Sequence, residues 1–280
     1  MAVPLFIFAA TVCRFLADRK CGNPDKKLRN VLEYRTKSQE SKLDNTYLPV
    51  LEQLLIDLSD REKAQVLDQF RVIIGSIIIL ASPLSTCSLA RMLDMSTDTI
   101  DDILDWLHSV LSIPSAPESP VRLLHLSFRD FLLDPEKRET NPFWVDEQQT
   151  HRQLAAHCLR VMSGCLRTDI CGLQAPATPR RAIDPKIIEA SLPSEVQYAC
   201  LYWVYHVEHS KTQPCDGDQV HDFLCRYFVQ WLEALSLIGR ASESISIIKT
   251  LQSLVQVSHL RHLCVCYKLT LTYIGQHTAI

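Results

Sequence analysis

Glycine is scarce in this sequence. Only 7 of the 280 residues are glycine, about a third of the number that average usage predicts. None of them begins the pattern G-x-x-x-x-G-K-[ST], whose backbone amides and lysine hold the phosphates of a nucleoside triphosphate. The chain alone is therefore predicted to have no catalytic residue, to bind no cofactor and not to be an enzyme.

An excess of charge of one sign and a long apolar run are also lacking. The net charge of −3 gives no general attraction to nucleic acid or to an anionic membrane. The longest apolar run after the N-terminal segment, residues 73–81, is too short to span a bilayer. Residues 1–13 resemble the apolar part of a signal peptide, but no Lys or Arg precedes them. Their helical spacing predicts a buried helix instead, in a soluble, cytoplasmic protein without a membrane partner.

Cysteine is present but shows no regular spacing. Eleven cysteines in a chain of this length fit buried thiols in a reducing cytosol better than a disulfide framework. The cluster within residues 259–266, which holds two histidines and two cysteines, has the spacing of no common zinc module. His206 and His209 have no acidic or cysteine partner placed to complete a metal site, and we expect them to flank a surface. No metal site is predicted.

Helical signals fill most of the chain. Ser59 with Glu62 forms a capping box, and Ser85 and Ser96 are further helix-capping residues. Apolar residues at helical spacing predict a series of helices, among them residues 47–58, 96–111, 147–166, 220–238 and 242–255. The sequence therefore predicts a mainly α fold.

Three consecutive helices, a proline-rich loop and a strand at Val121 predict a winged helix with a small β wing around residues 113–126. A proline-containing junction near residue 140 separates it from more helices. The predicted domains are a helical domain (1–58), the winged helix (59–140), a second helical domain (141–256) and a divergent tail (257–280).

A winged helix raises the alternative of a DNA-binding regulator with a helical partner-binding domain. Its third helix argues against this alternative. That helix has no Lys or Arg between Ser96 and Leu111, and its four carboxylates would repel DNA phosphates. They are Asp98, Asp101, Asp102 and Asp105. We therefore expect no nucleic-acid partner.

The segment from Val121 to Asp134 joins the predicted strand to a helix. Ser127 and Asp130 have the spacing of a capping box that opens this helix. His125 is then expected at a strand end, beside helix N-terminal amides that suit a phosphate. The alternative is that His125 is a hydrogen-bonded core residue.

Several segments carry a resemblance to a known family, and they lie between residues 3 and 256. They are residues 4–15 (PLFIFAATVCRF), 124–134 (LHLSFRDFLLD), 191–203 (SLPSEVQYACLYW) and 220–239 (VHDFLCRYFVQWLEALSLIG). The chain resembles fungal NACHT-domain, NOD-like STAND proteins of the vegetative-incompatibility type. Residues from Val257 onward cease to resemble the family.

The resemblance implies a position downstream of the nucleotide-binding core, as regulatory and oligomerisation domains commonly followed by WD-type repeats. It implies that His125 contacts a bound nucleoside diphosphate and holds the resting state, with Pro4 packing near the nucleotide pocket. ATP or GTP, or ADP or GDP, would be bound by the complete parent protein, which acts in self/non-self recognition and programmed cell death. The partners implied are the NACHT core, the WD repeats and other copies in a homo-oligomer. The alternative to a fragment of a larger receptor is a non-functional gene fragment.

Overall fold

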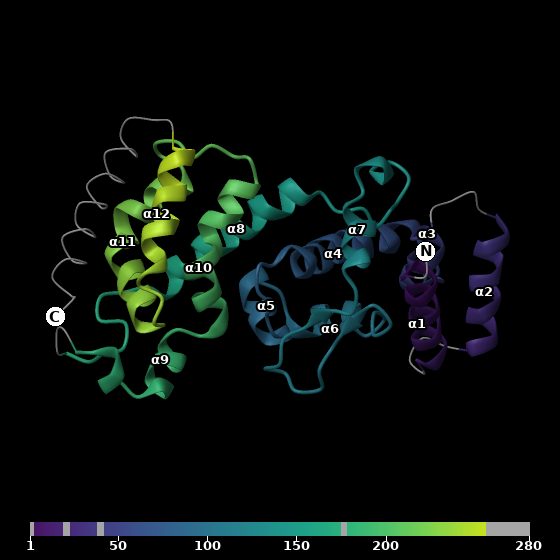
Figure 1. Cartoon of the computed structure of the whole chain (residues 1–280), viewed down its shortest axis with the longest axis horizontal. Coiled ribbons are helices and arrows are strands. Elements are labelled where there is room, and N and C mark those ends of the chain that lie inside the picture. Colours follow the sequence, from purple (N-terminus) through teal and green to yellow (C-terminus); the bar gives the residue numbers. More distant parts are fainter. Residues whose placement is uncertain (1–2, 19–22, 38–41, 175–177, 256–280) are drawn as a thin grey trace. The chain divides into compact units, whose positions relative to one another are not determined.

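The computed structural model describes residues 3–18, 23–37, 42–174 and 178–255. Its internal contacts divide the chain into two compact units, Met1–Thr150 and His151–Ile280. Helices make up most of the described chain (Figure 1), and the sheet found among these residues has two strands. The predicted mainly α class is confirmed. The division into three domains and a tail stays a prediction.

The first unit opens with three helices that contact one another, α1 (Val3–Ala17), α2 (Pro24–Lys37) and α3 (Asp44–Leu51). The elements that follow are η1 (Glu52–Leu55), α4 (Asp60–Ile79), α5 (Thr86–Leu93), α6 (Thr97–Leu104), β1 (Leu111–Ser112), β2 (Arg122–Leu123), α7 (Leu126–Leu133) and η2 (Pro135–Lys137). The strands pair antiparallel, with Leu111 opposite Leu123. The order of helices and strands follows the prediction, but β1 lies just before the predicted wing of residues 113–126, and each strand has only two residues.

Three of the N-terminal caps that the sequence predicts are present. The Ser59 hydroxyl accepts from the amide of Glu62, whose carboxylate accepts in return from the Ser59 amide at 2.8 Å. The Ser85 side chain caps α5 by accepting from the Ser88 amide, and the Ser96 side chain caps α6 by accepting from the Thr99 amide. These caps satisfy amide groups that have no partner within their helix.

Two predicted helices end earlier than expected. The helix predicted over residues 47–58 ends with η1, because Ile56 is extended and Asp57 has a φ of 60°. The helix predicted over 96–111 ends at Leu104. Leu107 and Leu111 are nevertheless buried, since turn hydrogen bonds carry the chain onward from Leu104 to Leu107 and then to Leu111.

The core of the first unit contains aromatic pairs from distant parts of the sequence. Phe70 of α4 meets Phe143 edge to face, with ring centroids 5.1 Å apart. Tyr47 of α3 lies 5.1 Å from Phe128 and 5.3 Å from Phe131 of α7, measured between ring centroids. These pairs join α4 and α3 to the segment that follows the hairpin. Aromatic pairs of this geometry add stabilising free energy to that from the burial of apolar area.

The helix α8 (Glu147–Cys165) begins in the first unit and continues into the second. The second unit then contains η3 (Arg180–Ala182), α9 (Pro185–Ser191), α10 (Ser194–His209), α11 (Gln219–Leu237) and α12 (Glu243–Leu254). The last three helices contact one another (Figure 1). In their core, Trp203 meets Trp231, whose indole N–H donates to the Cys200 carbonyl at 2.9 Å.

The sequence did not predict α9. In this helix Asp184 accepts from the Lys186 amide, and Pro185 occupies the first helical turn, where a missing N–H costs nothing. The expectation that cysteines are buried holds for Cys158 and Cys200. It is wrong for Cys13, Cys215 and Cys225, which are exposed. None of the helices in the described ranges is long and apolar enough to cross a bilayer.

Replacing Phe70 tests this core. Phe70 is fully buried, so Phe70→Ala should lower the free energy of unfolding of the first unit by about 3–5 kcal/mol through lost burial and a residual cavity. Phe6→Ala is the matched control, because Phe6 is 77% exposed, and it should change that free energy by less than about 0.5 kcal/mol. Urea unfolding measures both. Equal losses in the two variants would contradict the assigned packing.

Candidate functional site

His125 is the residue that caps α7. Its backbone is extended, with φ −152° and ψ 140°, and its Nδ1 accepts from the Ser127 amide at 3.0 Å. The predicted capping box of Ser127 and Asp130 is therefore wrong. The cap lies two residues earlier, and the imidazole itself occupies the helix amide that was expected to suit a phosphate.

The hydrogen bonds around Ser127 fix the direction of the His125 ring. The Ser127 hydroxyl lies 2.8 Å from His125 Nδ1 and 2.6 Å from the Tyr47 hydroxyl. Because Nδ1 accepts from the Ser127 amide, the Ser127 hydroxyl also donates to it, and Tyr47 in turn donates to Ser127. In the neutral ring the hydrogen then lies on Nε2. His125 can donate that hydrogen to a ligand without losing its cap.

Burial raises the pKa of Tyr47, which hydrogen-bonds to Ser127. Tyr47 is 1% exposed, and desolvation raises its pKa above the usual value, while the Ser127 hydrogen bond partly opposes the rise. The Tyr47 hydroxyl therefore stays protonated at neutral pH and remains a donor to Ser127.

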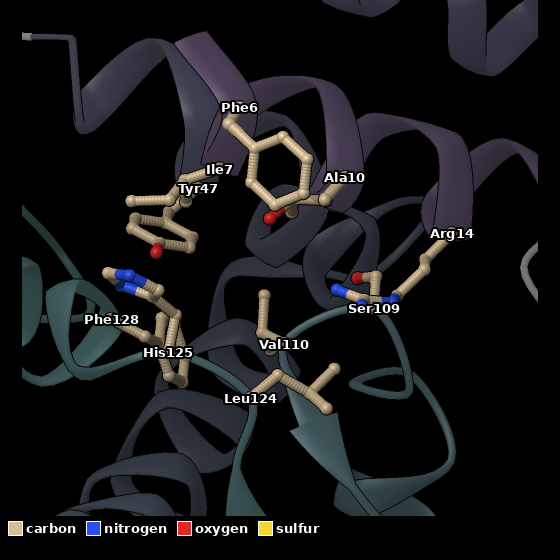
Figure 2. Close-up of a pocket in the computed structure, with 11 residues that line it drawn as sticks. Phe6, Ile7, Ala10, Arg14, Tyr47, Ser109, Val110, Leu124, His125 and Phe128 are labelled. Carbon is tan, nitrogen blue, oxygen red and sulfur yellow. The ribbon is translucent and has the colours of Figure 1, made fainter. Parts of the chain in front are cut away.

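A small pocket of about 90 Å³ opens beside His125, between α1 and the hairpin. Figure 2 shows the imidazole near the Tyr47 hydroxyl, with Phe6 and Ala10 of α1 across the pocket and Arg14 extending toward Ser109. The described residues that line it include Arg14 and no carboxylate. The pocket therefore combines several apolar side chains with hydrogen-bond donors and one permanent positive charge.

The buried hydroxyl of Ser109 is a second observation that favours a polar ligand in this pocket. Its side chain is 2% exposed, lines the pocket, and has a hydroxyl oxygen that hydrogen-bonds to no other group in the described part of the chain. Leaving such a group unpaired costs about 1–3 kcal/mol. A polar ligand group in this pocket would remove that cost.

The surface around the pocket is apolar. Phe6 is 77% exposed and Leu126, next to His125, is 70% exposed. Leu124 of the hairpin is 37% exposed. Pro4, the second predicted site residue, lies in the first turn of α1, and its side chain is outside the described residues.

The acidic face predicted on the third helix is present on and just after α6. Asp98, Asp101, Asp102 and Asp105 are all exposed. The cluster at residues 259–266 lies outside the described residues. Elsewhere, the described ranges contain no group of three or more His, Cys, Asp or Glu side chains arranged to hold a metal ion.

One feature was missed by reasoning from the sequence. His206 was expected at a surface, but it is fully buried and its Nδ1 lies 2.9 Å from Nδ1 of His151, which is 1% exposed. The buried neighbours Val204 and Val207 could have indicated that His206 is buried. They could not reveal the pair, because His151 lies 55 residues earlier in the sequence.

Comparison with known proteins identifies a relative of this chain. The vegetative incompatibility protein HET-E-1 of Podospora anserina is 29% identical to this chain over 89% of the chain. The predicted resemblance to fungal NACHT-type proteins is confirmed. The chain spans 19% of the length of HET-E-1. No family model and no solved structure matches the chain.

The cap at His125 leads to a stability prediction. His125→Ala removes the acceptor of the Ser127 amide and should lower the free energy of unfolding by about 0.5–2 kcal/mol. His125→Asn should retain most of that energy, because Asn is among the best N-cap residues. Chemical denaturation of both variants makes the comparison. A larger loss for Asn than for Ala would contradict a capping role.

Proposed function

We propose that this chain is a regulatory and oligomerisation segment of a larger fungal NLR-like signalling NTPase, which takes part in self/non-self recognition and programmed cell death. The similarity to a vegetative incompatibility protein over 89% of the chain supports the proposal. In it, the segment does not turn over nucleotide. The NACHT core and the WD repeats belong to other parts of the same polypeptide.

The observation that carries the proposal is the pocket beside His125, in which hydrogen-bond donors and a positive charge occur without a carboxylate. Its lining includes His125, whose Nε2 carries a hydrogen in the neutral ring, the positively charged Arg14, and Ser109, whose hydroxyl has no partner among the described residues. Donors and positive charge favour a phosphate group over a cation. With about 90 Å³, the pocket is well below the roughly 300–1,000 Å³ of a complete ligand site. It therefore suits one wall of a nucleotide site whose other walls come from the core.

This arrangement gives a mechanism for the resting state. A nucleoside diphosphate, ADP or GDP, held by the core would accept from His125 and join the core to the winged helix. The exposed apolar side chains of Phe6 and Leu126 around the pocket would be buried in the same contact. Release of the diphosphate removes the bridge, so the helical units move as rigid bodies and become free to assemble with other copies.

Replacing His125 in the complete protein tests this role. A hydrogen bond to a charged group contributes about 1.5–3 kcal/mol, so His125→Ala should raise the diphosphate off-rate roughly 10- to 150-fold and favour spontaneous assembly. Triphosphate binding should change less. Stopped-flow release of a fluorescent diphosphate measures the rate. His108→Ala is the control, since this histidine of the same unit does not line the pocket. An unchanged off-rate in a normally folded His125→Ala protein would remove His125 from the mechanism.

The alternative of a DNA-binding regulator is favoured by the order of helices and hairpin and opposed by charge. The four exposed aspartates on and just after α6 lie where a recognition helix would need positive charge. We therefore predict that the chain does not bind duplex DNA at physiological salt. Fluorescence anisotropy with labelled duplex is the measurement, and salt-dependent binding at sub-micromolar protein would support the alternative.

A further inference from the structure

A buried chain of hydrogen bonds joins two helices of the second unit. The hydroxyl of Tyr198 lies 2.7 Å from Nε2 of His206, and Nδ1 of His206 lies 2.9 Å from Nδ1 of His151. All three side chains are almost completely buried. Tyr198 and His206 belong to α10, whereas His151 belongs to α8. These hydrogen bonds therefore hold α8 against α10.

The contact between the two imidazoles limits the number of protons that the pair can carry. A hydrogen bond between two Nδ1 atoms needs one hydrogen, donated by one ring and accepted by the other. A neutral pair satisfies this, and so does a pair in which one ring is protonated. When both rings are protonated, two N–H groups and two positive charges face each other across 2.9 Å. The closed contact therefore excludes the second proton.

The surroundings of His206 supply no compensating negative charge. Burial is the main cause that lowers the pKa of His206, to about 3, and the charges of His151 and His209 act in the same direction. The ring of His209 lies 5.0 Å from that of His151 and 4.1 Å from that of Tyr205, measured between centroids. Both tyrosines of this cluster, Tyr198 and Tyr205, are neutral in acid.

Glu195 is a buried carboxylate of α10, and its charge is among those that raise the pKa of the Cys165 thiol. Three further charged residues on the neighbouring helices have other contacts or are exposed. Arg152 of α8, next to His151, donates to the Thr212 hydroxyl at 3.1 Å. On α12, which packs against α10, Glu243 pairs with Arg240 and Lys249 is exposed. Acidification therefore brings a second positive charge to the histidine pair with no carboxylate acting on His206 to balance it.

We propose that His151 and His206 form a pH-sensitive clamp, which holds the N-terminal half of α8 against α10 and opens when the pair takes up its second proton. His151 is the first residue of the second unit, on the helix that both units share. The clamp lies where the chain enters the second unit, and it shares no residue with the lining of the pocket beside His125.

The direction of the pH effect follows from proton counting. In the open state each histidine titrates near its ordinary pKa of about 6.5, so the open state binds more protons than the closed state below that pH. Stability of the closed contact is fully present above about pH 6.5 and is lost as pH falls below it. One extra proton changes the opening equilibrium by up to about tenfold per pH unit.

Hydrogen–deuterium exchange of the whole chain between pH 7.5 and pH 5.0, corrected for intrinsic rates, tests the clamp. Protection of amides in residues 151–160 and 198–209 should fall roughly tenfold or more across the acid part of this range. His206→Gln should remove this pH dependence, because a neutral amide keeps a hydrogen bond to His151 in either protonation state. His157→Gln on the same helix α8 is the matched control and should respond like the unmodified chain.

Protection that does not change with pH in the unmodified chain would overturn the proposal. The same pH response in His206→Gln would also overturn it. Should His206→Gln fail to fold, nitrogen chemical shifts of the two imidazoles in the unmodified chain decide the matter. Two protonated rings within a unit whose amides remain protected would contradict the clamp, and at most one protonated ring in the protected unit would support it.

Discussion

The hydrogen bond from Tyr47 to Ser127 is the interaction on which the proposed site depends. It crosses 80 residues of sequence, and it joins α3 to the first turn of α7 at 2.6 Å between the two oxygens. Tyr47 is held in place by Phe128 and Phe131, so the direction of the hydroxyl is set by the core. The Ser127 hydroxyl in turn donates to Nδ1 of His125, so the hydrogen of the neutral ring lies on Nε2 and can be donated to a ligand. A catalytic or sensing group gains from such support, because its orientation need not be fixed at the moment of binding.

The pocket beside His125 and the outer face of α6 have opposite electrostatic character within one unit. Arg14, Ser109 and His125 give the pocket donors and positive charge, whereas α6 exposes carboxylates. Anions are therefore favoured at the pocket and repelled from the face that a DNA-binding winged helix would use. The same distribution supports the regulatory proposal and opposes the DNA-binding alternative, although both share the order of helices and hairpin.

Local signals in the sequence predicted more of this structure than contacts between distant residues did. The caps at Ser59, Ser85 and Ser96 involve residues within one turn, so their spacing was sufficient. The capping box at Ser127 was predicted wrongly, because Tyr47 and His125 both bind that serine and no spacing rule contains Tyr47. Pairing of His206 with His151 was missed for the same reason. His125 lies beside a pocket, as the structure shows, and its role toward nucleotide stays a prediction.

The tautomer of His125 tests the central claim most directly. Long-range nitrogen–proton correlation spectra of the chain at pH 8 distinguish the two ring nitrogens of each neutral histidine, and His125→Asn assigns the His125 signals by their loss. The hydrogen-bond chain predicts that His125 carries its hydrogen on Nε2, and that Ser127→Ala, which removes one of the two donors to Nδ1, reduces this preference. A neutral His125 with its hydrogen on Nδ1 in the unmodified chain would contradict the account.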